Sequence, residues 1–543
     1  MHLTAYPVSS LEKVFADRVC TAPAYPQMRA LRGEAVSFQV VYRTDTPANV
    51  TAQLQTPPSL AGSLFTVESV PADMPCYPDP LCRDDNYLFY TPGSVPDVLV
   101  PMRDAHAVEA NQTYAIWVQM KISAEAKAGT YPITVALSAA NAADTASSVV
   151  SFTLTVCPFT LPAQTLKVTQ WFHADCIASY YQIPVFSEAH WTWMERFLRV
   201  AVEHGQTMVL TPVLTPALDT AVGAERPTVQ LIDVTKTETG YTFGFDRLHR
   251  FLRMARDCGI RQFEISHLFT QWGAKAAPKV VDTDGNHLFG WDTPADGAYL
   301  DFLAQMLPAL CRELQACGKP QDFVFHISDE PHSDEDLAQY KKLKEFVAPL
   351  VEGFSIMDAL SRYEFYEQGA TEHPVVATNA IDAYLAHQVP DLWAYYCCGQ
   401  HVGCANRFLA MPSARNRILG WQLFYYDIAG FLHWGYNFYY TQYSKRALDP
   451  FVETHAGGGF PSGDAFVVYP GKDEVLVSLR LKVFYEGLQD LRALQLLAEK
   501  KGAAFVKELI LRRAGGTFTF TEYPHDARFL LTLRDEINQL LCE

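Results

Sequence analysis

FVFHISDEPHSDEDLAQYKKLKEFVAPL, residues 323–350, contains one complete strand-and-helix unit. Its first six residues form a mostly apolar run of the length of a buried strand. Ser333 and Asp336 have the spacing of a helix capping box, and an amphipathic stretch follows them. Between strand and helix, Asp329 and Glu330 stand side by side, where the cap needs neither of them. The unit predicts a β/α fold with two acids at the end of a strand.

Similar units continue on both sides of this stretch. Between residues 168 and 445 we count eight strand-like segments joined by helical connectors. This number and order predict a (β/α)8 barrel of the TIM type over residues 168–445. A doubly wound open sheet is the alternative, but no Gly-rich phosphate loop follows the first strand, which weakens it.

The two ends of the chain have other patterns. Apolar and polar residues alternate in four segments of the first 160 residues, namely 34–43, 112–122, 129–137 and 151–159. A period of two is typical of strands with one buried face, so we predict an antiparallel β-sandwich over residues 1–160, with 158–167 as a linker. For residues 446–543 we predict a helical region that packs on the barrel. One helix face there is apolar, with Leu481, Phe484, Leu488 and Leu491.

Composition excludes several classes of protein. The chain has 543 residues, which suggests several domains, and a formal net charge of −17 without a Lys/Arg-rich run. This argues against nucleic acid and anionic membranes as partners. No apolar run is long enough to span a bilayer, and the N-terminus lacks the pattern of a signal peptide. Twelve cysteines are ordinary for reduced thiols, so we expect a cytoplasmic protein, whether monomer or homo-oligomer.

The adjacent acids are the strongest functional signal in the sequence. Active sites of barrel enzymes lie at the C-terminal ends of the strands, which is where Asp329 and Glu330 are expected. Capping of the next helix is the structural alternative, but Ser333 and Asp336 already serve that end. Two neighbouring like charges raise the pKa of at least one of them, which suits a general acid.

Glycoside hydrolysis uses two carboxylates at a barrel mouth, usually on separate strands. Neighbouring acids suit a substrate-assisted reaction, in which one protonates the leaving oxygen and the other holds the 2-acetamido group of the substrate. A metal site is the rival chemistry, because His326, Asp329, Glu330 and His332 lie close in sequence. No second His/Asp cluster is evident, so we predict no metal and no cofactor.

The motif HISDEP (326–331) resembles glycoside hydrolase family 123, the β-N-acetylgalactosaminidases, and relatives that share their catalytic domain. Further segments are similar to motifs of that family: PGSVPDVLVP (92–101), WAYYCCG (393–399), GFLHWGYNF (430–438) and SLRLKVFYEGLQDLRAL (478–494). The resemblance implies a β-sandwich followed by a barrel, and substrate-assisted hydrolysis of β-linked N-acetylhexosamine with retention. It implies that Glu330 is the acid/base and that Asp329 orients the acetamido group.

A sugar site also needs aromatic platforms and polar groups for hydroxyls. Strand-end residues of the predicted barrel supply our candidates for substrate binding: His173, Asp175, His267, Trp272, Tyr395, Tyr396, Asn406, Arg407, Trp434 and Asn437. Glu264, inside the third strand, is read as a buried, paired acid. The group Cys397, Cys398, His401 and Cys404 lacks the spacing of a zinc knuckle, and no G-x-S-x-G elbow of a serine hydrolase is present.

Three hypotheses follow from these residues. The first is a glycoside hydrolase acting on β-linked N-acetylhexosamine, with N-acetylgalactosamine as the first candidate. The second is a hydrolase of another glycoside that uses Glu330 with a distant carboxylate such as Glu264. The third is a glycan-binding protein without activity, although such a protein has no use for a like-charge pair. All three have a carbohydrate as partner.

Overall fold

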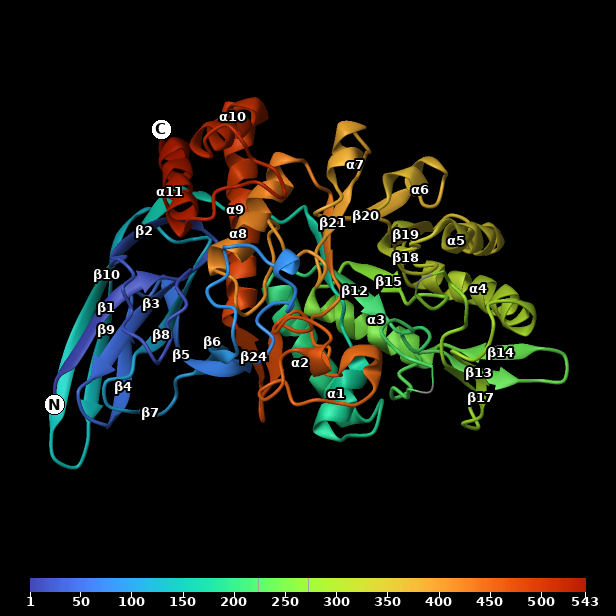
Figure 1. The fold of residues 1–543 in the computed structure, drawn as a ribbon, viewed down its shortest axis with the longest axis horizontal. Coiled ribbons are helices and arrows are strands. Elements are labelled where there is room, and N and C mark those ends of the chain that lie inside the picture. Colours follow the sequence, from blue (N-terminus) through green and yellow to red (C-terminus); the bar gives the residue numbers. More distant parts are fainter. Residues whose placement is uncertain (223, 272) are drawn as a thin grey trace.

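The computed structural model describes residues 1–222, 224–271 and 273–543. It has a sheet-rich N-terminal part, a nearly closed barrel of eight parallel strands and a C-terminal helical segment (Figure 1). Among the described residues, no helix combines the length and the apolar character that crossing a bilayer requires.

Two sheets pack face to face in the N-terminal part. The first sheet has seven strands in the order β1 (Leu3–Ser9), β3 (Ala35–Thr44), β8 (Tyr114–Ile122), β5 (Leu60–Ala72), β6 (Gly93–Pro101), β24 (Val475–Ser478) and β23 (Val468–Pro470). The second has five strands in the order β2 (Gln27–Arg32), β10 (Thr145–Thr160), β9 (Gly129–Ala140), β4 (Ala48–Gln55) and β7 (His106–Val108). Phe38 and Phe152 stack at 3.9 Å between ring centroids and join the sheets in one core.

The expected alternation of buried and exposed residues holds for part of this sandwich. β9 alternates along its second half, with one face in the core and the other toward solvent. β3 and β8 are instead buried along most of their length. The C-terminal helix α9 (Leu479–Lys501) covers their outer face, where Lys482 donates to Gln119 and Gln489 bonds the backbone of Ala35. The prediction of one exposed face is wrong for these two strands.

Eight parallel strands form the barrel. Their order is β11 (Lys167–Gln170), β22 (Gly430–His433), β21 (Trp393–Tyr395), β20 (His373–Ala377), β19 (Ser355–Ala359), β18 (Phe323–Phe325), β15 (Gln262–Ile265) and β12 (Met208–Thr211). At the seam between the first and last strands, the Thr207 backbone N–H donates to the Val168 carbonyl over 2.9 Å, which brings the two edges together.

Helices connect the strands of the barrel. They are α1 (Ala174–Tyr181), α2 (Glu188–Glu203), α3 (Asp246–Cys258), α4 (Gly297–Cys317), α5 (Asp334–Val347), α6 (Tyr363–Glu367), α7 (Asp382–Ala386) and α8 (Ser413–Tyr425). Short 3-10 helices occur at η1 (Pro80–Cys82), η2 (Pro320–Asp322), η3 (Ala348–Val351), η4 (Gln442–Ser444) and η5 (Ala456–Gly458). Ser187 caps the start of α2, and its hydroxyl accepts from the His190 N–H.

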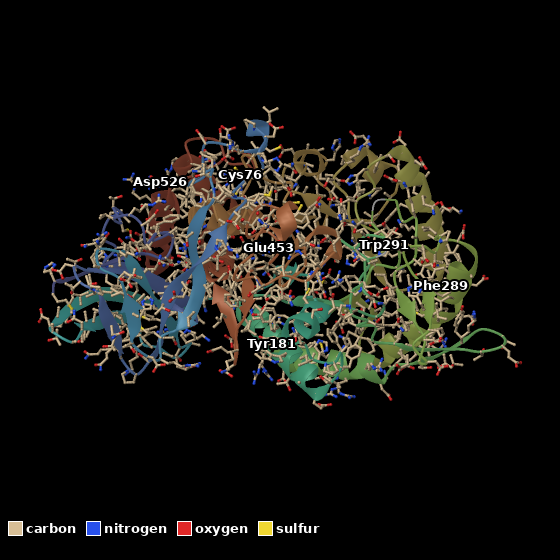
Figure 2. All side chains as sticks on the ribbon, turned by 60° about the horizontal axis from the view of Figure 1, so that its bottom comes forward. Cys76, Tyr181, Phe289, Trp291, Glu453 and Asp526 are labelled. Carbon is tan, nitrogen blue, oxygen red and sulfur yellow. The ribbon has the colours of Figure 1, made fainter. Side chains whose placement is uncertain are left out.

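Two hairpins are inserted beyond strand ends of the barrel. The first, β13 (Asp233–Lys236) with β14 (Tyr241–Gly244), follows β12. The second, β16 (Val280–Val281) with β17 (His287–Phe289), follows β15. Phe289, labelled in Figure 2, is buried. Its ring packs against Tyr299 and Phe302 of α4. This contact holds the second hairpin against the barrel wall.

The C-terminal helices α9, α10 (Ala503–Arg513) and α11 (Ala527–Cys542) complete the fold (Figure 1). α9 crosses α8 closely, since a Cβ built on Gly420 lies 1.9 Å from the Gly487 carbonyl oxygen. Only glycine permits this approach. The predicted helix face of α9 is confirmed as buried, and so is most of the rest of the helix.

Buried ion pairs join the three parts of the chain. Asp490 of α9 accepts from Arg417 of α8 over 2.7 Å and from Arg534 of α11 over 3.1 Å. Arg480 at the start of α9 donates to both carboxylate oxygens of Asp97 in β6, over 2.9 and 2.8 Å. The segments 92–101 and 478–494, singled out in the sequence, therefore meet each other through charge.

The Asp97 pair yields a test of this architecture. Asp97→Asn keeps the side-chain volume but leaves the buried Arg480 without its counter-ion, since Asp97 is fully buried. We expect the free energy of unfolding to fall by about 1.5–3 kcal/mol, the range for hydrogen bonds to charged groups. Urea unfolding measures it. Asp17→Asn, which removes an exposed surface pair, is the control and should change stability by less than about 0.5 kcal/mol; equal losses in both variants would contradict the role of Asp97.

Candidate active site at the strand ends of the barrel

Asp329 and Glu330 lie between the end of β18 and the start of α5, on the face where the barrel strands end. The predicted capping box is confirmed: Ser333 Oγ accepts from the Asp336 N–H over 3.1 Å, and the Asp336 carboxylate accepts from the Ser333 N–H over 3.2 Å. Neither Asp329 nor Glu330 takes part in this cap. Both side chains are partly exposed, which leaves them accessible from the barrel mouth.

The backbone at Glu330 is strained. Its φ is +40°, in the left-handed region that residues with a Cβ rarely adopt, and Pro331 follows. Such a conformation costs roughly 1–3 kcal/mol and persists where surrounding structure imposes it, often at functional sites.

Both acids hold their protons more tightly than ordinary carboxyl groups. Burial raises the pKa of Glu330 from its ordinary value of 4.5 to about 7. The pKa of Asp329 is raised well above its usual range. Burial is the largest cause, and the nearby carboxylates of Glu330 and Asp358 add to it. The two neighbours titrate as a pair, because the charge of either one opposes ionisation of the other.

A charged histidine lies under this pair. His326 stands between two acids from neighbouring strands: its Nε2 is 3.1 Å from Glu264 Oε2 and its Nδ1 is 3.2 Å from Asp358 Oδ1. Trp171 donates to Glu264 over 2.9 Å, and the Tyr340 hydroxyl donates to Asp358 over 2.5 Å. We call these residues the floor network.

The floor network is charged and enclosed. Burial alone would lower the pKa of His326, but its hydrogen bonds to Asp358 and Glu264 outweigh burial and raise the pKa to about 10. The imidazolium in turn favours the ionised form of Asp329 above it. Glu264 is fully buried and paired, as expected, which removes support from the hypothesis that it is a distant catalytic carboxylate.

The floor also contains the one group of potential metal ligands found among the described residues, His267, His326 and Asp358. The imidazole rings of His267 and His326 stack at 4.4 Å, and both nitrogens of His326 already face carboxylates. A metal ion would need one of these nitrogens as an unprotonated ligand. The hydrogen bonds account for the cluster, and we propose no metal there.

On another side, the mouth is bounded by residues that follow β21 and β22. A hydrogen bond with Cys398 and burial raise the pKa of the Cys397 thiol, and the nearby Glu330 and Asp464 carboxylates add to the effect. Trp434, which is half-buried, donates from Nε1 to Asp464 over 2.9 Å. Cys397 is therefore close enough to Glu330 for its charge to act on the thiol, and Trp434 contacts Asp464, the second acid that acts on Cys397.

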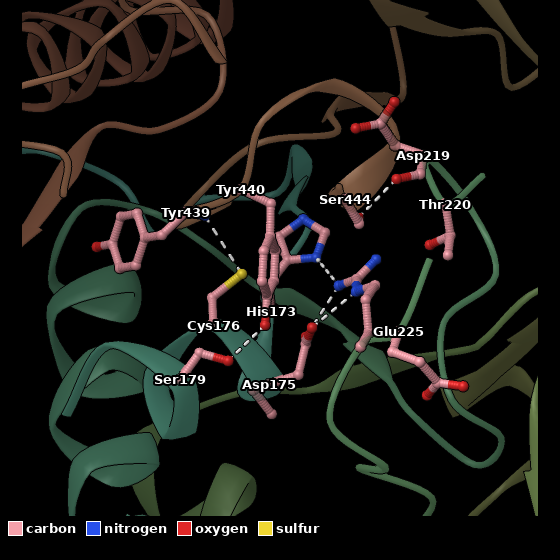
Figure 3. Close-up of polar contacts among 12 residues, drawn as sticks. His173, Asp175, Cys176, Ser179, Asp219, Thr220, Glu225, Tyr439, Tyr440 and Ser444 are labelled. Atoms are coloured by element: carbon pink, nitrogen blue, oxygen red, sulfur yellow. Dashed lines mark hydrogen bonds and ion pairs between the residues drawn. The ribbon is translucent and has the colours of Figure 1, made fainter. Parts of the chain in front are cut away.

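Several of the residues predicted to bind sugar are enclosed by protein instead. They are His173, Asp175, Tyr396, Asn406, Arg407 and Asn437, all buried. Asp175 accepts from both Nε and Nη2 of Arg226, over 2.7 and 2.9 Å, and His173 contacts the same guanidinium (Figure 3). Their polar groups have partners inside the protein, and a role for them in sugar binding stays a prediction.

Three more of the predicted residues have hydrogen-bond partners at the loop beyond β21 and at the ends of β11 and β22. Asn406 donates to the carbonyls of Cys397 and Gln400, both over 2.8 Å, which fixes the course of this loop beside Glu330. Arg407 donates to Gln170, His433 and the backbone of Asp464. Asn437 bonds both backbone groups of His173 and so joins the ends of β11 and β22.

The other predicted sugar-binding residues have mixed positions. Tyr395 is mostly buried, with its hydroxyl 3.1 Å from Ser361 Oγ, and His267 is part of the floor. Trp434 keeps an exposed part. Trp272 lies outside the described residues.

Sequence reasoning missed two acids at this site. Asp358 stands in β19, inside an apolar segment, and the same signal that identified Glu264 could have identified it. Asp464 lies in an irregular segment beyond the barrel, where no periodic pattern distinguishes it; burial raises its pKa to about 7. Its position follows from the fold alone.

Comparison with protein families gives the site its context. The model of the glycoside hydrolase 123 catalytic domain matches residues 171–497, which is more than half of the chain and includes Asp329, Glu330 and the floor network. The chain belongs to glycoside hydrolase family 123. The resemblance seen in the sequence motifs is thereby confirmed, and a carbohydrate is the partner that a glycoside hydrolase implies.

A solved structure of a family 123 enzyme has the same fold over nearly the whole length of both chains. A family 123 glycoside hydrolase from Clostridium perfringens, described in a study of glycolipid glycan hydrolysis, has a TM-score of 0.75 with 16% identity and covers 99% of this chain and 98% of its own. A Parabacteroides merdae β-glucuronidase matches at a TM-score of 0.31 with 12% identity, over 90% of this chain and 51% of its own. The latter likeness is too weak to support an argument. No protein of curated function matches the sequence.

Proposed function

We propose that this family 123 enzyme hydrolyses β-linked N-acetylhexosamines, with N-acetylgalactosamine as the first candidate, by a substrate-assisted mechanism with retention. The observation that carries the proposal is the pair Asp329–Glu330. The two acids are free of the helix cap, have raised pKa values and stand at the strand ends of a barrel that we treat as a (β/α)8 barrel. We keep residues 168–445 as the proposed catalytic domain, between a sandwich domain at 1–160 and a C-terminal region at 446–543.

In the first step, the 2-acetamido carbonyl oxygen attacks the anomeric carbon and the bond to the leaving oxygen breaks. Glu330 gives its proton to that oxygen. An acid with a pKa of about 7 is protonated often enough at neutral pH and still releases its proton readily. The positive charge that develops on the oxazolinium ring lies beside Asp329, whose carboxylate accepts a hydrogen bond from the acetamido N–H.

Substrate binding settles which acid keeps the proton. The acetamido N–H is a donor, so it favours the ionised form of Asp329 and leaves the shared proton on Glu330. The His326 imidazolium in the floor acts in the same direction, because it lowers the pKa of Asp329. The floor network thus supports the assignment of Glu330 as acid and Asp329 as the charged partner.

In the second step, Glu330 acts as a base. It accepts a proton from water, the water oxygen bonds to the anomeric carbon on the face that the leaving group occupied, and the oxazolinium ring reopens to the acetamide. Two inversions give net retention, and no enzyme nucleophile is required. Glu264 is unsuited to the role of an enzyme nucleophile, since it is fully buried and held by Trp171 and His326.

The hydrolysis of a glycolipid glycan studied for the Clostridium perfringens relative supports a glycan as substrate class. Half-buried Trp434 is the aromatic platform that we propose for the reacting sugar.

Paired aryl glycosides test this function. We expect turnover of 4-nitrophenyl N-acetyl-β-galactosaminide and no turnover of 4-nitrophenyl β-galactoside, which lacks the acetamido nucleophile. An N-acetyl-derived thiazoline, which resembles the cyclised intermediate, should inhibit at concentrations at least about 100-fold below KM. Initial rates with and without thiazoline measure both expectations. Turnover of the 2-hydroxyl sugar that thiazoline leaves unchanged would contradict the substrate-assisted mechanism.

A further inference from the structure

Two cysteines stand side by side just beyond the end of β21. Cys397 and Cys398 are free thiols, and both side chains keep part of their surface exposed. In a regular strand, neighbouring side chains point to opposite faces. Here the chain turns at Cys398 and Gly399, and the two thiols are hydrogen-bonded to each other. Two accessible thiols in contact are the starting material of a disulfide.

Other protein groups hold the two thiols only weakly. The Gly399 N–H donates to Cys397 Sγ over 3.5 Å, and the Tyr77 hydroxyl bonds the Cys398 thiol. Sulfur is a weak hydrogen-bond acceptor, so the pair gives up little when it is oxidised. Among the described residues, neither cysteine belongs to a group of potential metal ligands. The pair therefore has no structural or metal-binding role that accounts for it.

The cysteine pair is coupled to the proposed active site. The Glu330 carboxylate is near enough for its charge to act on the Cys397 thiol. The Cys397 carbonyl accepts from Asn406 over 2.8 Å, and the Cys398 carbonyl bonds His401 Nδ1 over 3.1 Å. The course of the loop beyond β21, on the side of Glu330, thus depends on the positions of these two cysteines.

A segment of the sandwich domain meets the same loop. Residues 73–92 connect β5 to β6 and contain the buried Cys76, labelled in Figure 2. Next to it, Tyr77 bonds the Cys398 thiol, and its ring lies 5.3 Å from that of His401, edge to face. Cys398 is therefore a point at which the sandwich domain contacts the barrel mouth.

We propose that Cys397 and Cys398 form a site of reversible oxidation, at which a low-molecular-weight disulfide converts the two thiols into a vicinal disulfide and lowers the activity of the enzyme. The effect on activity rests on the proposed function, whereas the modification itself does not.

The reaction is thiol–disulfide exchange in two steps. The thiolate of one cysteine attacks a sulfur of the oxidant R–S–S–R, whose S–S bond breaks, and R–S⁻ leaves with the electron pair. The second thiolate attacks the cysteine sulfur of this mixed disulfide and expels the other R–S⁻. The two protons from the cysteines end on the two leaving groups. The protein thus loses two hydrogen atoms, and the oxidant gains them as two R–SH.

The ring that forms is strained. Neighbouring Cα atoms are about 3.8 Å apart, whereas disulfides usually join Cα atoms about 4.4–6.8 Å apart. Strain makes a disulfide easier to reduce, as is typical of labile, regulatory bonds. Closure of the ring also separates Cys398 from Tyr77 and moves the Cys397 carbonyl that holds Asn406, so the loop shifts beside Glu330.

Peptide mapping tests the modification and needs no turnover. Cys542→Ser serves as the parent protein, because the thiols of Cys157 and Cys542 also bond each other, where α11 meets β10. The parent is incubated with excess oxidised glutathione at pH 8, and free thiols are then blocked with N-ethylmaleimide. We expect the peptide that contains Cys397 and Cys398 to lack two hydrogen atoms and to carry no maleimide on either residue.

Two results of the mapping would overturn the proposal. One is a pair that stays fully blocked by maleimide or stops at the mixed disulfide with glutathione. The other is a disulfide from either cysteine to Cys404, which fragmentation on the C-terminal side of Gly399 distinguishes from the vicinal ring.

kcat/KM for 4-nitrophenyl N-acetyl-β-galactosaminide measures the consequence of oxidation. We expect a fall of about 10-fold or more, because a displacement of about 1 Å beside a catalytic group has effects of this size. Dithiothreitol should restore the activity. Cys398→Ser in the same parent keeps a hydroxyl for Tyr77 but has no second thiol, so it should retain most of its activity and lose none to oxidised glutathione.

The outcomes of these assays separate the two proposals. A closed ring with unchanged kinetics, or equal inactivation of Cys398→Ser, would overturn the effect on activity. If the reduced enzyme does not turn over this glycoside, the proposed function fails, and the mapping still decides the modification.

The rate of ring closure tests the coupling to the catalytic pair. The charge of Glu330 opposes formation of the Cys397 thiolate, and exchange requires thiolates. Glu330→Gln should therefore close the ring about two-fold faster or more at pH 8, measured by the loss of free thiols in the Cys542→Ser parent. Glu474→Gln removes an acid paired with Arg103 and is the control, with an unchanged rate. Equal rates in all three proteins would contradict the coupling.

Discussion

Glu330→Gln is expected to lower kcat by roughly 10²–10⁴ on glycosides with poor leaving groups, the usual contribution of a general acid. The substitution keeps the size of the side chain and removes the proton that the leaving oxygen needs. Alkyl glycosides show the full effect. Aryl glycosides with an acidic phenol need little protonation, so their first step should be slowed much less, and the ratio of the two losses measures the acid role.

The pH dependence of stability provides an independent check on Glu330. A pKa raised from 4.5 to about 7 means that ionising Glu330 in the folded enzyme is unfavourable. This penalty is absent below pH 4.5, grows as the pH rises and is complete above pH 7. Glu330→Gln should therefore melt higher than wild type at pH 8 and at about the same temperature at pH 4. An unchanged alkyl-glycoside kcat together with a lower melting temperature at pH 8 would contradict the assignment.

Asp329→Asn is expected to lower kcat by roughly 10²–10³, about 3–4 kcal/mol of transition-state stabilisation, which is typical of removing one preorganised electrostatic group. Asparagine retains an oxygen that can accept from the acetamido N–H, but it lacks the charge that balances the oxazolinium. KM should change less than kcat, because the charge matters most in the transition state.

The same variant should alter the pH–rate profile. In the wild-type complex, the Asp329 carboxylate opposes ionisation of its neighbour Glu330. Its neutralisation should move the alkaline limb of kcat to lower pH. Measurements of kcat from pH 4 to 9, with a melting curve for each protein, test both effects. Full kcat with a melting temperature several degrees lower would identify Asp329 as a structural residue.

Local patterns in the sequence were sufficient for the elements near the catalytic pair. The capping box of Ser333 and Asp336 and the buried, paired state of Glu264 agree with the structure. Such features depend on neighbours within a few residues, or on the rule that an acid inside an apolar strand needs a partner. The alternation in β3 and β8 predicted one exposed face for each strand. That prediction was wrong because helix α9, more than 350 residues later, buries this second face.

The candidate sugar-binding residues show where local patterns end. Sequence position placed Asp175, Asn406 and Asn437 correctly beyond strand ends, yet each has its polar group satisfied inside the protein. Whether a polar residue at a barrel mouth faces a ligand or another side chain depends on what the neighbouring loops bring to it. For Asp175 that neighbour is Arg226, 51 residues away.

The sequence by itself determined the adjacency of Asp329 and Glu330, their place between strand and helix, and the β/α order that puts them at a barrel mouth. The adjacency of the two acids is covalent, and the β/α order is visible in apolar patterns that repeat every few residues. Both can therefore be read from one sequence. The tertiary structure alone decided what surrounds the pair. His326 contacts Glu264 and Asp358, 62 and 32 residues away, because parallel strands β15, β18 and β19 lie in register. Burial of that ion network sets the protonation of the acids above it, and burial is a property of the folded chain.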